Sequence, residues 1–382
     1  MHICFITHEY PQEGVAHGGI GSFVKTLGAG LAEAGIRVSV VGVSSGEDEE
    51  KRDGNITIYR IRKSSVRGFA WWFNSRKLNS RLAKIHAEIP IDVIETAELG
   101  LAFLKKIKGI QYVIRLHGGH HFFAQAENRG INWWKGYQEK RSFAKADAFI
   151  AVSQYVWEHT AKYLSFHNKP VVKIRYPINR VLFRPTDTQV VPNLIVFAGT
   201  ICEKKGVREL IRAFSLVKQS IPDAQLKLYG RDWKFPDGSS YIEKIKVDEL
   251  SKLGKTAHDI TFCGPVAYAE IPEKLAESAV CVFPSHMETQ GLVAPEAMAM
   301  KKTVVFTKAG PGPETITDGE TGFLVDPHSP EDIAEKIIRV LQHPEESGKM
   351  AEKGALFVAE QYDLDRLTLK NIEFYRSLLH HR

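Results

Sequence analysis

The sequence predicts an α/β protein with two Rossmann-like, doubly wound parallel-sheet domains that face a cleft. Short apolar runs typical of buried strands alternate with segments of helical period, which is the pattern of βαβ units. The pattern runs twice, and a stretch with three prolines and no clear period, residues 176–193, separates the two series. A chain of 382 residues also exceeds what one core usually organises.

The first series begins with the strand HICFIT (2–7), a glycine-containing loop, and a helical segment that ends at Gly35. Further strands are expected at 37–43, 91–96, 112–118 and 147–153. We assign residues 1–185 to this domain. In a doubly wound sheet, ligands bind at the carboxyl ends of the strands, so the loops that follow these strands are candidate sites.

The second series predicts strands at 194–200, 224–230, 260–264, 279–285, 302–307 and 322–325. We assign residues 186–360 to a second domain and read 176–193 as the linker between the two. Residues 361–382 form a last helix, which we expect to pack back toward the N-terminal domain.

Composition limits the class and the compartment of the protein. With 43% hydrophobic and 25% charged residues, the chain is an ordinary globular protein. Four dispersed cysteines form no CxxC pair, which argues against a zinc site or a disulfide framework and fits a reducing cytosol. There is no leader-like start and no run of about 18 apolar residues. The expected location is therefore cytoplasmic.

Charge is distributed unevenly along the chain. Residues 1–185 hold 27 Lys and Arg against 16 Asp and Glu, whereas residues 186–382 hold 24 against 29. A basic first domain indicates an anionic partner, either a phosphate-bearing substrate or lipid head groups, although scattered solvated lysines explain the count equally well. We expect no nucleic-acid partner.

Two carboxylates flank Gly291 at a predicted strand-to-helix junction. Glu288 lies in the loop after strand 279–285, and Glu296 follows Pro295, which suits the first turn of a helix. A carboxylate can accept two hydroxyl hydrogen bonds at once, as the vicinal diol of a ribose or a sugar presents them. Alternatively, Glu296 compensates the helix dipole and Glu288 is a solvated loop residue. The pairing at a strand end favours a functional role.

The stretch ETQGLVAPE (288–296) resembles the E-x7-E signature of the retaining, nucleotide-sugar-dependent glycosyltransferases of family 4, which have the GT-B fold. The resemblance spans nearly the whole chain, and its second half is the specific part. Similar segments are the glycine loop at 8–27, RLHGG at 115–119, FAGTICEKKGVRELIRAF at 197–214 and GPGPETITDGETGFLV at 310–325.

The resemblance implies a donor site in the second domain. Glu296 would hold the ribose hydroxyls of the donor and Glu288 the transferred sugar, while Lys205 would neutralise the diphosphate, whose charge grows as it departs. Backbone N–H groups for the sugar and diphosphate would come from Thr289, Gln290, Gly291, Leu292 and Val293.

One position departs from the family. Thr200 follows Gly199 where the family usually carries an arginine, so one cation is missing from its customary place. A threonine hydroxyl can donate a hydrogen bond but does not replace the charge. Arg231 and Arg175 are the candidates to supply that charge from another loop.

In the first domain, Gly18 and Gly19 precede a helix, so the backbone can approach a phosphate closely. His117 ends a strand before two glycines and matches the family histidine that reaches the donor sugar and the acceptor. The alternative is a histidine satisfied in the core. His120 and His121 could suggest a metal site, but no acidic residue follows them at the spacing of a metal ligand. We expect no metal and no cofactor.

Two basic segments rich in aromatic residues leave an alternative open. Residues 66–85 include Trp71, Trp72 and Phe73, and 132–143 repeat the pattern. Such a helix can lie in an anionic membrane interface. Alternatively, its aromatic residues pack in the core or line an acceptor site.

These observations predict a retaining, metal-independent hexosyltransferase of cell-surface polysaccharide or glycolipid biosynthesis. Its donor would be a UDP- or GDP-sugar and its acceptor a glycan or lipid-linked glycan, at the inner face of the membrane. We expect attack from the face of the departing group, with a diphosphate oxygen helping to deprotonate the acceptor. The alternatives are a nucleotide-sugar epimerase and a non-catalytic glycan-binding scaffold subunit with the same fold.

Overall fold

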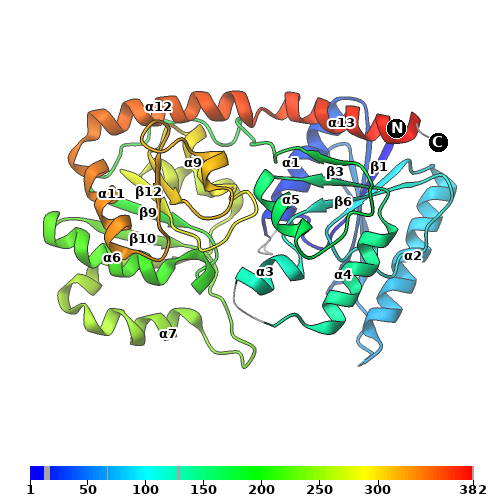
Figure 1. The fold of residues 1–382 in the computed structure, drawn as a ribbon, viewed down its shortest axis with the longest axis horizontal. Coiled ribbons are helices and arrows are strands. Elements are labelled where there is room, and N and C mark those ends of the chain that lie inside the picture. Colours follow the sequence, from blue (N-terminus) through cyan, green and yellow to red (C-terminus); the bar gives the residue numbers. More distant parts are fainter. Residues whose placement is uncertain (13–17, 67, 127–129, 381–382) are drawn as a thin grey trace. The chain divides into compact units, whose positions relative to one another are not determined.

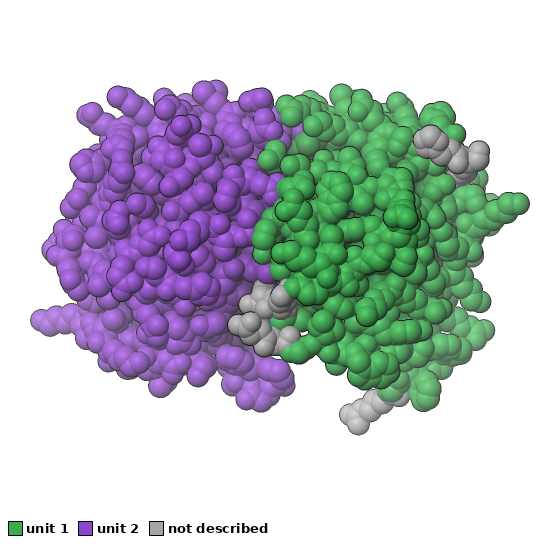
Figure 2. All heavy atoms as spheres, viewed as in Figure 1, with its two compact units in different colours: residues 1–177, 364–382 green, residues 178–363 purple. Residues whose placement is uncertain are grey.

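The computed structural model describes residues 1–12, 18–66, 68–126 and 130–380. The chain divides into two compact units (Figures 1 and 2). Unit 1 comprises Met1–Pro177 together with Leu364–Arg382, and unit 2 comprises Ile178–Asp363. The chain therefore leaves unit 1, forms all of unit 2, and returns to unit 1 for its last helix.

The sheet of unit 1 has the strand order β3-β4-β2-β1-β5-β6-β7-β8 in the part of the chain that the structure describes. Every neighbouring pair is parallel except β3 and β4. The strands are β1 (His2–Ile6), β2 (Arg37–Ser44), β3 (Glu49–Asp53), β4 (Ile56–Arg62), β5 (Val93–Thr96), β6 (Gln111–Leu116), β7 (Ala148–Ala151) and β8 (Val171–Lys173).

The sheet of unit 2 is parallel throughout, with the order β11-β10-β9-β12-β13-β14. Its central strands are buried along their whole length, as the continuous apolar runs predict. The strands are β9 (Leu194–Ala198), β10 (Gln225–Tyr229), β11 (Ile260–Gly264), β12 (Val280–Phe283), β13 (Val304–Thr307) and β14 (Phe323–Val325).

Helices alternate with these strands in both units (Figure 1). Unit 1 contains α1 (Gly19–Glu33), α2 (Ala70–Glu88), α3 (His120–Ala126), α4 (Trp133–Lys145), α5 (Gln154–Ala161) and α13 (Leu364–His380). Unit 2 contains α6 (Val207–Ser220), α7 (Tyr241–Asp248), α8 (Ile271–Ala276), α9 (Val293–Ala299), α10 (Gly312–Thr315), α11 (Pro330–Gln342) and α12 (Pro344–Gln361), together with the short 3₁₀ turns η1 (Glu203–Lys205), η2 (Leu250–Lys252), η3 (Gly254–Asp259) and η4 (Tyr268–Glu270).

Local sequence explains why two helices of unit 2 form and pack together. In α6 the buried residues recur at helical spacing, including Leu210, Phe214 and Val217. Helix α11 begins with Pro330 directly after Ser329, whose side chain accepts a hydrogen bond from the backbone N–H of Asp332. The apolar faces of α6 and α11 pack against each other.

The sequence did not predict β3, β4 or β8. Because β3 runs antiparallel to β4, the first sheet is mixed and is not the wholly parallel sheet that we expected. Strand β3 reads EEKRD and is mostly exposed, so it lacks the apolar alternation by which strands are recognised. It forms a hairpin with β4 through Gly54, which has a positive φ of 57°. Charged residues on such an edge strand discourage pairing with other chains.

Unit 2 begins at Ile178, inside the segment that we predicted to be the linker. Ile178 and Phe183, which we read as linker residues, are each 1% exposed and belong to the core of unit 2. Asn179 turns the chain between them, because its side chain accepts hydrogen bonds from the backbone N–H groups of Val181 and Leu182. The sequence analysis missed this burial because the apolar residues of the segment follow no helical or strand period.

Helix α13 completes unit 1 by packing on α1. The contact is close at Gly30, where a Cβ atom would collide with Thr368. Deeper in, Asn371 Oδ1 accepts a hydrogen bond from the Arg115 guanidinium at 2.6 Å, and the Tyr375 hydroxyl donates to Glu95. These residues join α13 to the buried ion pair of Arg115 with Glu95.

Among the described residues, no helix combines the length and the apolar character needed to cross a bilayer.

Candidate functional site

The site in unit 2 lies where the strand order of the sheet reverses. From β9 the chain continues to β10 and β11 on one side, and then returns to β12 on the other side of β9. Because crossovers leave in opposite directions here, the carboxyl ends of β9 and β12 mark the position at which doubly wound sheets form a crevice for a ligand. Most of the predicted donor-binding residues lie in the loops that follow these two strands.

Gly206 allows the two loops to approach each other closely. It has a positive φ of 68° and lies between the short turn η1 and the start of α6. A Cβ atom at this position would collide with the backbone carbonyl of Pro284, in the loop after β12. Glycine is therefore required both by the backbone conformation and by the close approach of the second loop.

Lys205 and Glu288, predicted from the sequence to act on the same ligand, contact each other directly. The Lys205 ammonium donates a hydrogen bond to Glu288 Oε1, across 83 residues of sequence. Their side chains remain 23% and 11% exposed. A cation and a carboxylate are thus held at the surface of one crevice, each within reach of a polar ligand.

Gly291 gives the loop between Glu288 and α9 its shape. Its φ is +73°, and a Cβ atom would lie 2.6 Å from the ring of Phe306 on β13. Thr289 and Gln290 before it are buried, and Leu292 and Val293 after it are half-buried where α9 begins. The glycine therefore allows the loop to fold against the sheet and to bring Glu288 back toward Lys205.

Glu296 lies in the first turn of α9 and is buried, with 6% of its surface exposed. Burial raises its pKa to about 7, although the Tyr268 hydroxyl donates a 2.6 Å hydrogen bond to its Oε1 and favours the charged form. Compensation of the helix dipole alone does not explain why this carboxyl group is buried and held by Tyr268. Tyr268 lies 28 residues away in sequence, and no motif pointed to it.

Arg231 lies beside Thr200, the position at which the family's arginine is missing. The Arg231 Nε–H donates a hydrogen bond of 3.4 Å to Thr200 Oγ1. The segments are tied further by the backbone, because the N–H of Ile201 donates to the carbonyl of Arg231. A guanidinium from the loop after β10 therefore approaches the place where the customary cation would stand.

In unit 1, His117 directly follows β6 and is half-buried. Its Nδ1 shares a hydrogen bond with the hydroxyl of Tyr176, and the two rings stack with centroids 5.6 Å apart. Phe23 of α1 packs against both rings. The imidazole is therefore fixed in orientation, and among the described residues Nε2 has no hydrogen-bond partner and can meet a ligand.

The His117 imidazole is neutral at physiological pH. Burial, together with the positive charge of Arg115, lowers its pKa to about 3. A neutral ring donates a hydrogen bond from one nitrogen and accepts one at the other, but it brings no charge of its own. This suits a residue that orients polar groups of a substrate.

Two buried carboxylates that sequence reasoning missed support the loop after His117. Glu98 accepts a hydrogen bond from the backbone N–H of Gly118, and Glu139 accepts those of His120 and His121. Burial raises the pKa of Glu98 to about 8, with the nearby Glu139 contributing. Neither carboxylate belongs to a local motif, and only the fold brings them to this loop.

These contacts also explain the run of histidines in this loop. His121 Nδ1 pairs with the buried Glu139, and the His120 ring accepts a hydrogen bond from the backbone N–H of Asn132. The rings thus serve to fix the loop against α4. Gly119 is needed beneath them, because a Cβ atom there would collide with Glu139.

We expected the backbone at Gly18 to lie close to a phosphate group, but a negatively charged side chain lies there. A Cβ atom at Gly18 would collide with the carboxylate of Glu9, which therefore lies against this glycine. Gly19 is the first residue of α1. An anion at Gly18 would be repelled by Glu9, so the geometry favours unit 2 for the diphosphate.

The aromatic residues of 66–85 do not pack in the core. Trp71, Trp72 and Phe73 of α2 are 40%, 43% and 37% exposed, and Trp133 of α4 is 75% exposed. Trp71 also contacts Trp134, which links the two basic aromatic segments on one surface. Arg67 lies outside the described residues. We call the exposed parts of α2 and α4 the aromatic surface.

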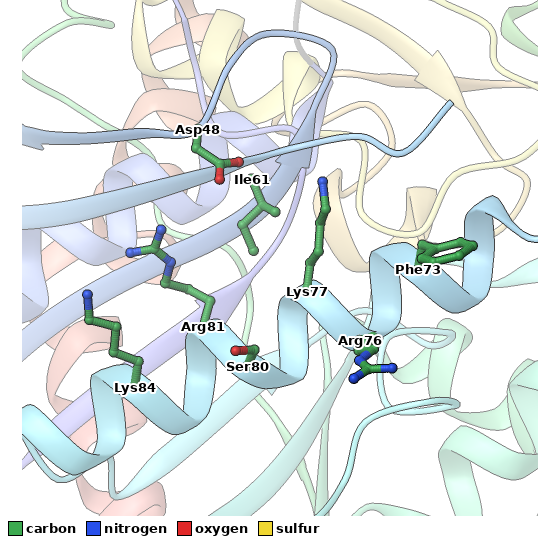
Figure 3. Close-up of a pocket in the computed structure, with 8 residues that line it drawn as sticks. All are labelled: Asp48, Ile61, Phe73, Arg76, Lys77, Ser80, Arg81 and Lys84. Atoms are coloured by element: carbon green, nitrogen blue, oxygen red, sulfur yellow. The ribbon is translucent and has the colours of Figure 1, made fainter. Parts of the chain in front are cut away.

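A cavity of about 400 Å³ lies beside this surface, between α2 and the end of β4 (Figure 3). Figure 3 shows long basic side chains of α2 lining one side and Asp48 on the other. Arg76 also packs over the ring of Trp72. The lining residues are Asp48, Ile61, Phe73, Arg76, Lys77, Ser80, Arg81 and Lys84.

Comparison with known proteins agrees with this architecture. Residues 180–357 match the family model "Glycosyl transferases group 1", and residues 17–180 match "Glycosyltransferase Family 4". An uncharacterized glycosyltransferase of Methanocaldococcus jannaschii is 25% identical over 368 residues, which cover 94% of this chain and 95% of that protein.

Two solved structures share the fold over nearly the full chain. Sucrose-phosphate synthase from Thermosynechococcus elongatus has a TM-score of 0.87 at 22% identity and covers 100% of both chains. The Anabaena protein Alr3699/HepE, in complex with UDP and glucose, has a TM-score of 0.76 at 17% identity and covers 99% of this chain and 100% of its own.

Proposed function

Because the chain belongs to the glycosyltransferases of group 1 and family 4, with the GT-B fold, we propose that it transfers a hexose from a UDP-sugar to a hydroxyl group with retention of configuration. The observation that carries this proposal is the contact between Lys205 and Glu288 in the crevice where the sheet of unit 2 reverses its order. The family favours transfer over the epimerase and scaffold alternatives.

The donor binds to unit 2 in this proposal. The Lys205 ammonium moves from Glu288 to the diphosphate, where it stabilises the charge that grows on the leaving group. Glu288 is then released to accept hydrogen bonds from hydroxyl groups of the sugar. Glu296 accepts those of the ribose, and the backbone N–H groups of residues 289–293 contact the sugar and diphosphate. The Anabaena structure, which holds UDP and glucose on the same fold, supports uracil as the base.

His117 acts at the reacting end of the donor. Its ring is neutral and is held by Tyr176, so Nε2 can make one directed hydrogen bond to the sugar or to the acceptor. We assign no nucleophile to the chain. Attack on the same face as the departing diphosphate, with a diphosphate oxygen taking the acceptor proton, needs only positioning and charge stabilisation from the protein.

The acceptor is a glycan or a lipid-linked glycan in cell-surface polysaccharide or glycolipid biosynthesis. Support comes from the aromatic surface and from the basic cavity beside α2, which suit an amphipathic molecule with an anionic head group. In this proposal the protein acts at the cytoplasmic face of a membrane. The chemistry proposed for the donor site involves no metal ion.

Calorimetry with UDP and transfer assays with UDP-sugars test the donor site. Lys205→Ala should weaken UDP binding by about 10- to 100-fold, the equivalent of one charge-assisted hydrogen bond. Lys204→Ala is the matched control, because it removes the same charge one residue away. If both variants bind UDP as the wild type does, or if the wild type binds no nucleoside diphosphate, the proposal is wrong.

His117→Ala separates chemistry from donor binding. The variant should keep its UDP affinity and melting temperature and lose most of its turnover. NMR of the product gives the anomeric configuration, and an inverted product would refute retention. A product formed from the donor alone, with an altered sugar still attached to UDP, would identify an epimerase.

A further inference from the structure

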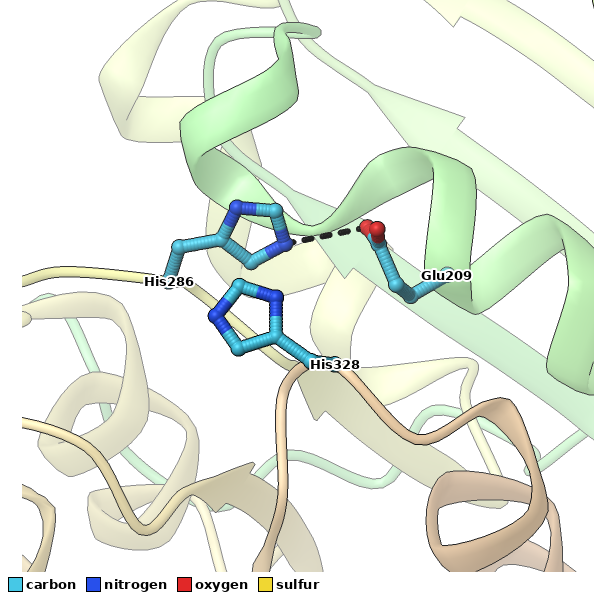
Figure 4. A group of neighbouring side chains, drawn as sticks. All are labelled: Glu209, His286 and His328. Carbon is cyan, nitrogen blue, oxygen red and sulfur yellow. Dashed lines mark hydrogen bonds and ion pairs between the residues drawn. The ribbon is translucent and has the colours of Figure 1, made fainter. Parts of the chain in front are cut away.

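We propose that Glu209, His286 and His328 form a binding site for a divalent transition-metal ion of the Zn²⁺ class in unit 2 (Figure 4). The three side chains come from separate parts of the chain. Glu209 lies on α6, His286 in the loop after β12, and His328 in the loop between β14 and α11. The proposal concerns a site other than the donor crevice and does not depend on the transfer reaction.

The ligand atoms already lie close together. His286 Nε2 is 3.0 Å from Glu209 Oε2, and one atom from each of the three residues lies within 4.8 Å of the others. Two ligands about 2.0–2.1 Å from a tetrahedral zinc ion are about 3.3 Å apart. The ligand atoms, all within 4.8 Å of one another, are therefore close to this spacing, and small side-chain rotations would reach it.

The donor set determines which ions fit. Two imidazole nitrogens and one carboxylate make a three-ligand set that zinc accepts in proteins, with a fourth position left for water or another ligand. Mg²⁺ and Ca²⁺ prefer oxygen ligands, so two imidazoles disfavour them. Figure 4 shows the His286 and His328 rings turned toward the Glu209 carboxylate.

A simple hydrogen bond between Glu209 and His286 explains only part of this cluster. The His328 ring lies 4.3 Å from the His286 ring, centroid to centroid, and among the described residues it makes no hydrogen bond. Its exposure leaves a path for an ion, whereas the side chains of Glu209 and His286 are only 11% and 15% exposed. A metal ion would give all three side chains a common partner.

The ion would brace the loop that carries the donor-site residues. The backbone N–H of His286 donates to the carbonyl of Lys204, and Glu288 follows two residues later. Glu209, in the first turn of α6, lies four residues after Lys205 in the sequence. Joining these residues through one ion would restrict the loops that hold the Lys205–Glu288 contact, so we assign the ion a structural role.

Titration calorimetry with Zn²⁺ alone, on tag-free protein dialysed against a chelator and without nucleotide sugar, tests the site. The wild type should bind one equivalent. His328→Ala removes an exposed ligand and should leave the fold intact, yet weaken binding by at least the roughly 10- to 100-fold that loss of a supporting hydrogen bond costs a metal site. His258→Ala, which removes an exposed histidine elsewhere in unit 2, should bind as the wild type does.

Hydrogen exchange provides a second measurement on the same samples. Zn²⁺ should slow exchange of the backbone amides in residues 285–290 of the wild type and not in His328→Ala, while Mg²⁺ should change neither. The proposal is overturned if the wild type takes up no zinc, or if His328→Ala and His258→Ala bind zinc equally. Loss of transfer activity alone would not bear on it.

Discussion

Burial makes Glu296 sensitive to pH in a way that solvated glutamates are not. Its pKa is about 7 in the folded protein, against 4.5 for the ordinary group. Between these values the folded state keeps a proton that the unfolded state has released, so this residue lowers the free energy of unfolding as pH rises from about 4.5 to about 7. Deprotonation is complete above that range.

Glu296→Gln should remove this penalty. Its amide oxygen can still accept the Tyr268 hydrogen bond, so the free energy of unfolding of the variant, relative to wild type, should rise by about 2–3 kcal/mol between pH 4.5 and pH 7.5. Urea unfolding at both pH values measures the difference. The exposed Glu352→Gln is the control, and a pH-independent difference for Glu296→Gln would contradict a raised pKa.

The contact of Arg231 with Thr200 predicts that the missing cation has been relocated. Arg231→Ala should then weaken UDP binding by about tenfold or more, since a charge-assisted hydrogen bond is lost. Thr200→Arg should weaken binding as well, because a second guanidinium would be forced against the first. Calorimetry with UDP measures both, and the exposed Lys252→Ala in the same unit is the control. Tighter binding by Thr200→Arg would show that the site lacked a cation.

Sequence could indicate residues that carry a local pattern. Lys205, Glu288 and Glu296 were predicted because each follows a strand or begins a helix within a recognisable motif. Tyr268 and Glu139 were not found, because their roles depend on contacts between segments far apart in the chain. The His286–His328 pair was overlooked for the same reason, since each histidine stands alone in its own loop.

At the scale of elements, the strands with continuous apolar runs were predicted, and the charged edge strand was not. β4 (Ile56–Arg62) was also missed, although its apolar residues largely alternate with polar ones, as in a half-buried strand. β1, β2, β5, β6, β7 and all strands of unit 2 lie where the sequence analysis expected them. β3 and β8 are short edge strands that bury little, so their sequences carry no hydrophobic period. Hairpin pairing with β4, and not apolar burial, places β3 in the sheet.

The aromatic surface predicts salt-dependent binding to anionic membranes. Vesicles that contain phosphatidylglycerol should co-sediment with the protein at low salt and release it at high salt, because surface attraction is screened over about 8 Å at physiological ionic strength. Trp72→Ala should reduce the bound fraction, since an exposed ring that packs on Arg76 is lost. Trp233→Ala removes an exposed tryptophan of unit 2 and is the matched control. Equal recovery on neutral vesicles would refute the idea.

At the scale of the molecule, unit 2 is continuous in sequence and encloses its own core. A fragment of residues 178–363 should therefore fold cooperatively and bind UDP. Removal of residues 364–382 from the full chain should instead destabilise unit 1, because Arg115 and Glu95 would lose Asn371 and Tyr375. Circular dichroism and thermal unfolding of both proteins measure this. A truncated chain in which unit 1 unfolds as in the wild type would contradict it.

The return of α13 to unit 1 also has a consequence for synthesis on the ribosome. The first 177 residues emerge early, yet the helix that covers α1 and the Arg115–Glu95 pair is translated only after all of unit 2. Domains generally fold in the order of their emergence. Here we expect the opposite order, because the N-terminal unit lacks the helix that covers α1 until unit 2 has been made.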